Sequence, residues 1–72
     1  MNRQELRRLR ERAALTQAEL AERVGVAATT IWRLEEGRRE GTIPILRRIA
    51  DTLAEATGKD VADVLKQLTD PA

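Results

Sequence analysis

The sequence predicts an all-α fold in which five short helices pack into one compact unit. Apolar residues recur at helical spacing throughout the 72 residues, no stretch alternates with a period of two, and no Asn-Gly or Asp-Gly hairpin turn occurs. A chain of this length supports one domain, which we assign to residues 1–69, with a short tail at 70–72. With no cysteine, no histidine and one aromatic residue, the domain has to be stabilised by the packing of aliphatic side chains.

The first helix is expected over about residues 2–13, where Leu6 and Leu9 fall on one face. Its other face is rich in arginine, and the charge of the whole chain is uneven. Residues 1–48 hold 11 Arg and seven Glu, a net charge of +4, whereas residues 49–72 hold two Lys, four Asp and one Glu, a net charge of −3. The excess of arginine over lysine fits phosphate recognition by guanidinium groups, and it fits the codon usage of a GC-rich genome equally well.

The second helix is expected to begin at Gln17, and signals at both of its ends define it. Thr16 and Glu19 form a T-x-x-E capping box, in which each side chain accepts a hydrogen bond from the other residue's backbone amide. Gly25 stops the helix, because glycine readily adopts the positive φ of a helix C-terminus. A helix of about two turns does not persist alone, so we expect this one to be held by packing.

The third helix is expected over about residues 28–36, with Ile31 and Leu34 facing inward and Gly37 at its end. A projection at about 100° per residue places Trp32 at the margin of the buried face. The side chains expected on the outer face are Thr29, Arg33 and Glu36.

Two further helices are expected in the second half of the chain. Thr42 is expected to cap a fourth helix, which carries Pro44 in its first turn and ends before Gly58. Asp60 is expected to cap a fifth helix that ends near Leu68. The apolar positions of the fifth helix are Val61, Val64, Leu65 and Leu68. These four exceed what one small core needs, so some of them are expected at a dimer interface.

Residues 16–37, TQAELAERVGVAATTIWRLEEG, resemble the helix-turn-helix of the phage lambda repressor/Cro-like family, which occurs in many bacterial regulators. The matching positions are Thr16-Gln17, Glu19-Leu20-Ala21, Val24-Gly25-Val26, Thr30-Ile31, Leu34-Glu35 and Gly37, with Leu6, Leu9 and Arg10 upstream and Leu46, Arg48, Ile49, Ala50 and Leu53 downstream. The resemblance implies a lambda-repressor-like fold, double-stranded DNA as the partner, and a third helix that enters the major groove.

The resemblance assigns base reading to the exposed side of the third helix, at Ala28, Thr29, Trp32 and Arg33. Arg33 is the strongest reader among them, because a guanidinium can bond O6 and N7 of guanine together. The methyl groups of Ala28 and Thr29 can contact thymine methyl groups. For Trp32 the sequence leaves three interpretations open: a half-buried scaffold residue, a DNA contact or a contact with a protein partner.

Backbone contacts are expected around the third helix. The expected DNA phosphate contacts are Gln17, Arg10, Arg38, Arg39 and Thr42. Gln17 has this role by resemblance, at a helix N-terminus whose free amides favour anions. The resemblance also implies an ion pair between Arg10 and Glu35 that fixes the third helix to the first. The plainer alternative for each of these polar residues is a solvated surface group.

Three features depart from the family pattern. Ala27 stands where the family has a Ser or Thr N-cap. The missing side-chain cap lowers the stability of the third helix by about 1 kcal/mol. Glu36 faces outward, where it should repel phosphates. The connection at residues 57–60 is about four residues longer than the family step from the fourth to the fifth helix, so the fourth helix is expected to gain a turn and the dimer geometry cannot be carried over.

The leading hypothesis is a sequence-specific transcriptional regulator, a repressor that binds a palindromic operator as a homodimer. The alternative is a protein-interaction module of antitoxin or adapter type that docks through the acidic residues 49–72. We expect no enzymatic activity, cofactor, metal or small-molecule ligand, since the chain lacks His, Cys, Tyr and a glycine-rich phosphate loop. The charged N-terminus has no signal-peptide pattern, so we expect a cytoplasmic protein at the bacterial nucleoid and no membrane partner.

Overall fold

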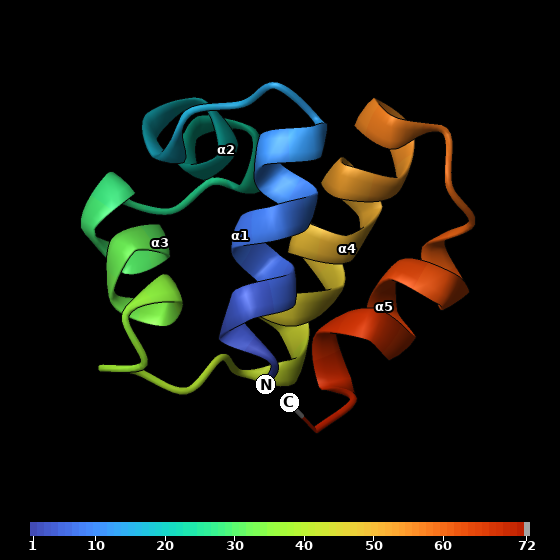
Figure 1. Ribbon diagram of the computed structural model, residues 1–72. Coiled ribbons are helices and arrows are strands. Elements are labelled where there is room, and N and C mark those ends of the chain that lie inside the picture. The colour runs from blue at the N-terminus through green and yellow to red at the C-terminus, as the bar shows by residue number, and fades with distance from the viewer. Residues whose placement is uncertain (72) are drawn as a thin grey trace.

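The computed structural model describes residues 1–71 as five helices and the loops that join them. The helices are α1 (Arg3–Arg12), α2 (Gln17–Val24), α3 (Ala28–Glu35), α4 (Ile43–Thr57) and α5 (Val61–Thr69). Because no residue between positions 1 and 71 lies in a strand, the all-α prediction is confirmed. Figure 1 shows α1 and α4 in the middle of the molecule, α2 and α3 on one side and α5 on the other.

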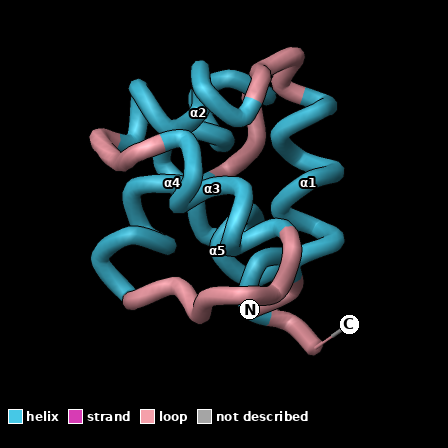
Figure 2. The backbone as a smooth tube through the Cα atoms, turned by 90° about the vertical axis from the view of Figure 1, so that its left-hand side faces the viewer, coloured by secondary structure: helices cyan, strands magenta, loops and turns pink. Residues whose placement is uncertain are grey.

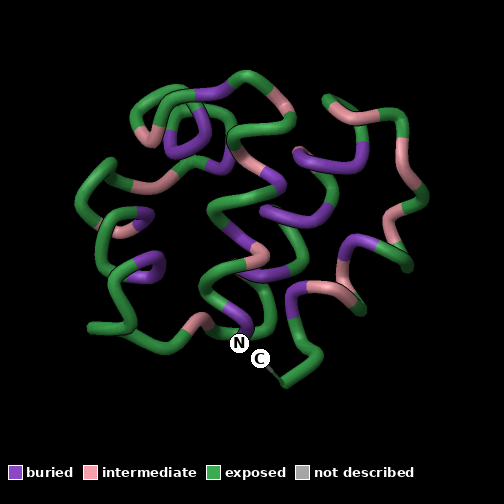
Figure 3. Tube along the Cα trace, in the orientation of Figure 1, coloured by how far each residue is buried: buried purple, intermediate pink, exposed green. Residues whose placement is uncertain are grey.

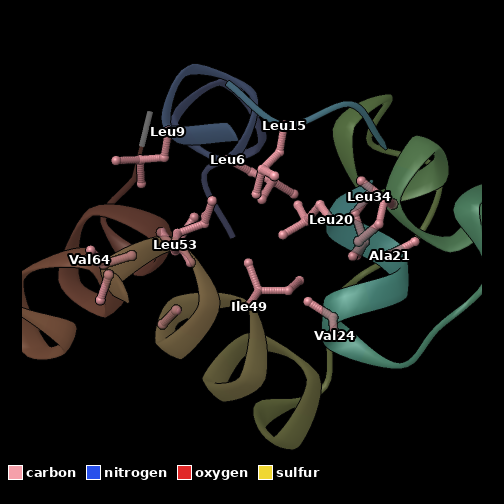
Figure 4. Packing of buried hydrophobic residues seen from close by; sticks show 14 residues of the cluster. Leu6, Leu9, Leu15, Leu20, Ala21, Val24, Leu34, Ile49, Leu53 and Val64 are labelled. Carbon is pink, nitrogen blue, oxygen red and sulfur yellow. The ribbon is translucent and has the colours of Figure 1, made fainter. Parts of the chain in front are cut away.

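The core is made of aliphatic side chains from all five helices, which pack together in one cluster (Figure 4). Figure 3 marks the buried positions along the chain. The largest fully buried side chains are Leu6, Leu9, Leu20, Ile31, Leu34, Ile49, Leu53, Val64 and Leu68. Leu15, in the loop between α1 and α2, is also buried, although it falls outside the expected helices. Burial of a side chain of this size contributes about 1.5–3 kcal/mol, so this one cluster holds the short helices together.

The predicted start and end of α2 are confirmed. The Thr16 hydroxyl accepts from the Glu19 amide at 3.0 Å, and the Thr16 amide donates to Glu19 Oε1 at 2.9 Å. Hydrogen bonds from the backbone and the side chain of Thr16 hold the pKa of Glu19 below its ordinary value of 4.5. Gly25 ends the helix with a φ of 85°, a conformation that an L-residue with a side chain adopts only at a cost.

The boundaries of α4 and α5 follow the sequence signals as well. Pro44 lies in the first turn of α4, and Gly58 ends this helix with a φ of 74°. The Asp60 side chain accepts from the Ala62 amide at 2.8 Å and so caps α5. The long connection therefore contributes residues to α4, which spans 15 residues. No helix between residues 1 and 71 has the length and apolarity needed to cross a membrane.

Two of the four apolar positions of α5 are not available for a dimer interface. Val64 and Leu68 are fully buried within the protein's own core, so neither side chain is free to face a second subunit. Val61 and Leu65 are half-buried and pack against the edge of the same core. Each half-buried residue lies one helical turn before a buried one, Val61 before Val64 and Leu65 before Leu68. All four therefore fit one apolar helix face, and the sequence pattern alone did not distinguish them.

Asn2 joins the two ends of the fold. Its side-chain Oδ1 accepts from the Glu5 amide at 3.2 Å and caps α1. Its backbone amide donates to the carbonyl of Leu68 at 2.6 Å, at the end of α5. Figure 1 accordingly shows the first and last described residues close together.

The C-terminus of α1 contains a residue in an unfavourable conformation. The Leu15 amide donates to the Arg10 carbonyl at 3.2 Å and the Ala14 amide donates to the Glu11 carbonyl at 3.0 Å, which is the Schellman pattern. Glycine normally occupies the left-handed position of this motif. Here the position is held by Ala14, with a φ of 58°.

We therefore expect Ala14→Gly to stabilise the protein by about 0.5–1 kcal/mol. Glycine removes the strain of the left-handed conformation, and this gain exceeds the cost of the greater conformational entropy that glycine gives the unfolded chain. Urea unfolding followed by circular dichroism measures the change. The neighbouring Ala13→Gly is the matched control. Ala13 is right-handed, with a φ of −77°, so glycine should destabilise there. Equal destabilisation by both changes would contradict the prediction.

Candidate nucleic-acid interface

The turn between α2 and α3 places α3 at the surface of the molecule. After Gly25 the chain reverses, and the Val26 amide donates back to the Ala21 carbonyl at 3.0 Å. Ala21 is buried where α2 meets its neighbours, and Val26 packs against the core from the turn. Figure 2 looks at the molecule from the side on which α2 and α3 lie in Figure 1.

The amphipathic pattern of α3 separates a buried side from an exposed side. Ile31 and Leu34 are fully buried. The four residues to which the sequence assigns base reading, Ala28, Thr29, Trp32 and Arg33, are all exposed. Trp32 retains 41% of its surface, so it is not a core residue. The structure therefore brings the expected readers together on one accessible helix.

The N-terminus of α3 has no side-chain cap. Ala27 has extended backbone angles and makes no capping hydrogen bond, as its methyl side chain requires. The first amides of a helix have no partner within that helix. The Ala27 carbonyl accepts from the Thr30 amide at 2.9 Å, so it is the amides before Thr30 that lack a side-chain cap and are available to water or to an anion.

A cluster of polar side chains fixes α3 from behind. Arg10 Nε donates to Glu35 Oε2 at 2.6 Å, and Arg10 Nη2 donates to Glu35 Oε1 at 3.1 Å. Gln17 Nε2 donates to the same Oε1 at 3.1 Å. The cluster joins α1, α2 and α3, and the side chains of Arg10 and Glu35 are only 12% and 3% exposed. The hydrogen bonding that Arg10 donates to Glu35 raises the pKa of Arg10, against the opposing effect of its burial.

This geometry includes the expected ion pair between Arg10 and Glu35. The third guanidinium nitrogen of Arg10, Nη1, donates to the carbonyl of Leu15 at 2.9 Å. All three guanidinium nitrogens of Arg10 thus donate hydrogen bonds within the protein, so Arg10 is part of the scaffold that holds α3. Gln17 is half-buried and uses one amide hydrogen for Glu35, which leaves the other hydrogen for an external acceptor.

The end of α3 is a second Schellman motif. The Gly37 amide donates to the Leu34 carbonyl at 3.2 Å, and the Arg38 amide donates to the Arg33 carbonyl at 2.9 Å. Gly37 has a φ of 72°, and a Cβ atom at this position would overlap the guanidinium of Arg3. Arg3 Nη1 donates to the carbonyl of Glu36 at 3.0 Å, so a cation lies at the negative end of the helix dipole.

The loop after α3 carries the remaining expected phosphate contacts. Arg38 and Arg39 are both exposed, and the guanidinium carbon of Arg38 lies 5.4 Å from the centre of the Trp32 ring. Thr42 is at the N-cap of α4, but its hydroxyl makes no capping hydrogen bond. Arg38 and Arg39 follow α3 in the chain, and Gln17, at the start of α2, reaches α3 through its hydrogen bond to Glu35.

Comparison with known proteins assigns the fold to a family. The family model described as a helix-turn-helix domain matches residues 3–64. The chain belongs to the helix-turn-helix family. This finding confirms the resemblance to the lambda repressor/Cro-like helix-turn-helix. The chain is also 43% identical, over 56 residues, to an uncharacterized HTH-type transcriptional regulator of Methanothermobacter thermautotrophicus strain Delta H. The aligned part covers 78% of this chain and 81% of that relative.

Two residues that shape this helix-turn-helix domain were missed by sequence reasoning. Arg3 was expected only on the outer face of α1, yet it bonds the C-terminus of α3. Asn2 was expected inside the first helix and is its cap. An N-cap signal, Asn followed three residues later by Glu5, is present in the sequence and would have identified Asn2. The contact of Arg3 has no local sequence signal.

Proposed function

We propose that this helix-turn-helix protein is a sequence-specific DNA-binding regulator of transcription, a repressor that acts in the cytoplasm on an operator of palindromic sequence. The observation that carries the proposal is the exposed side of α3, where Ala28, Thr29 and Arg33 are accessible. On its other side, α3 is fixed to α1 by the ion pair between Glu35 and Arg10. A rigid, protruding helix of this kind is what the family inserts into the major groove.

Base readout in this proposal is modest. Arg33 supplies two donors to one guanine, and the methyl groups of Ala28 and Thr29 contact thymine. No other side chain on this face offers a bidentate hydrogen-bonding pair. We therefore expect part of the sequence preference to come from the shape and flexibility of the DNA.

The phosphate contacts flank that reading face. Gln17 donates its free amide hydrogen at the N-terminus of α2, where the helix amides add positive potential. Arg38 and Arg39 contact DNA phosphates beyond the end of α3, and the Thr42 hydroxyl makes a further phosphate contact at the start of α4. The uncapped amides after Ala27 provide a further place for a phosphate oxygen.

A homodimer would place two copies of α3 in successive major grooves, about 34 Å apart. The surface available for pairing lies where α4 begins beside α5. Ile43 is 83% exposed there, and a depression of about 300 Å³ is lined by Leu46 and Leu65 next to it. In the dimer we propose, a two-fold axis would set Ile43 of each subunit against the depression of the other.

Binding to duplex DNA over a range of salt concentrations tests the proposal. If about 6–8 phosphates are contacted, the affinity should fall by several orders of magnitude between 50 and 200 mM salt. Selection of bound DNA from a random pool gives the operator, its symmetry and its half-site spacing in one experiment. Tight binding to a protein partner that is insensitive to salt, with none to DNA, would favour the interaction-module alternative.

Sedimentation of the protein, free and on its selected DNA, tests the homodimer. Two protein copies per palindromic site are expected. Ile43→Asp places a charge in the pairing surface, so the variant should bind a full palindromic site no more tightly than it binds a half-site. A single copy on DNA at high protein concentration would contradict the dimer without affecting the rest of the proposal.

A further inference from the structure

Trp32 is in an unusual place for the single aromatic residue of a small domain. Packing would be served best by burying so large a side chain, yet 41% of its surface is exposed. It lies on the exposed helix α3, and the Arg38 guanidinium carbon is 5.4 Å from the ring centre. That distance is within the range of a cation–π interaction. Arg38 is therefore held above a ring at the margin of the reading face.

The backbone brings Arg38 to this position. After α3 ends, Gly37 adopts its left-handed conformation, and the Arg38 amide bonds back to the carbonyl of Arg33. This reversal returns residue 38 to the last turn of α3 and to the ring of Trp32. Arg38 is therefore held in two places: its backbone amide bonds to the Arg33 carbonyl, and its guanidinium lies over the Trp32 ring.

Arg39 provides the contrast within the same loop. It carries the same charge and is also exposed, but it lines a separate cavity with Met1, Arg3 and Gln4 at the start of the chain. A long, flexible arginine loses considerable rotamer entropy when it binds a phosphate. Arg38 has lost part of that freedom before DNA arrives, because the Trp32 ring restricts its guanidinium.

We propose that Trp32 is a positioning residue for Arg38, and that the ring and the guanidinium together form one preordered clamp for a DNA phosphate at the C-terminal end of α3. The inference deepens the proposed function and rests on it. It assigns Trp32 to the DNA backbone and not to a base. The guanidinium donates to phosphate oxygens in its own plane while its face stays on the ring.

Fluorescence of the free protein tests the contact without DNA. Trp32 is the only aromatic residue in the chain, so it alone emits. Arg38→Ala removes the group above the ring and should shift the emission to longer wavelength, because water then reaches that face. Arg39→Ala removes the same charge from the same loop and should leave the spectrum unchanged. Identical spectra for Arg38→Ala and the wild type would overturn the proposal.

Binding to a short random-sequence duplex tests the clamp. Each phosphate contact contributes about 0.9 to the slope of log affinity against log salt, so Arg38→Ala should flatten the slope by about that amount for each subunit bound. Trp32→Leu should weaken binding by about two- to fivefold, as loss of an exposed cation–π contact requires. Trp32→Phe keeps an aromatic ring and should therefore retain most of the DNA affinity that Trp32→Leu loses. Circular dichroism confirms that each variant is folded.

The decisive comparison combines the changes. In the presence of Arg38→Ala, Trp32→Leu should cause little further loss, whereas with Arg39→Ala the two losses should multiply. Multiplying losses with both arginines would overturn the positioning role, and so would a Trp32→Leu effect confined to one base position. Failure of the wild-type chain to bind any duplex at about 50 mM salt would instead refute the proposed function, and this inference with it.

Discussion

Replacing Arg10 by methionine is expected to lower the free energy of unfolding by about 3–5 kcal/mol. The change leaves the Glu35 carboxylate, whose side chain is 3% exposed, with Gln17 as its remaining side-chain partner. An ionised group in so little water is costly unless it is paired. A domain of 72 residues has roughly 4–11 kcal/mol of total stability, so the loss is a large share. The midpoint of thermal unfolding, Tm, should fall by at least about 12 °C.

The matched control is Arg7→Met, one turn earlier on the same helix. Arg7 and Glu11 are 3.9 Å apart and more than half exposed, so this change should alter stability by less than about 1 kcal/mol. The double variant Arg10→Met with Glu35→Leu removes both charges and should recover part of the loss. Similar effects of Arg7→Met and Arg10→Met would show that the buried cluster is not what holds α3.

Arg33→Ala is expected to weaken binding to the selected operator by about tenfold to a hundredfold, while binding to random duplex changes much less. The physical reason is that Arg33 is the one strong hydrogen-bonding reader among the exposed residues of α3, and its replacement removes two donors from one guanine. Fluorescence titration of both duplexes at one salt concentration gives the ratio. Unfolding should be nearly unchanged, since Arg33 is exposed.

Gln17→Ala gives the opposite pattern if Gln17 contacts a phosphate. The loss should then be similar on every sequence, because phosphates carry no sequence information. Equal losses from Arg33→Ala on operator and random duplex would place Arg33 on the backbone. Selective loss from Gln17→Ala at one base position would likewise overturn its assigned contact.

Local chemistry was well predicted from the sequence. The capping box at Thr16, the glycine at position 25 and the cap at Asp60 are each decided by residues within four positions of one another. Their hydrogen bonds therefore follow from composition and spacing. The helix boundaries were predictable for the same reason, and so was the exposure of Arg33, because helical period alone separates the two sides of α3.

Contacts between distant segments were not predictable in this way. Arg3 reaches the carbonyl of Glu36, 33 positions away, and no pattern near either residue indicates it. Leu15 is buried although it belongs to a loop and not to a helical repeat. Trp32 and Arg38 are close in sequence, but their contact depends on the left-handed turn at Gly37. Nothing in the structure explains why Glu36 is an acidic residue.

The bond between Asn2 and Leu68 has a consequence for the order of events in folding. It joins backbone groups 66 positions apart, and the entropy lost on closing a loop grows with its length. Contacts between helices that are neighbours in sequence close much shorter loops. We therefore expect the pairs α2–α3 and α4–α5 to form early, and the joining of α1 to α5 through residue 2 to complete folding. Hydrogen exchange at the Asn2 amide reports that last step, and early protection there would reverse the order.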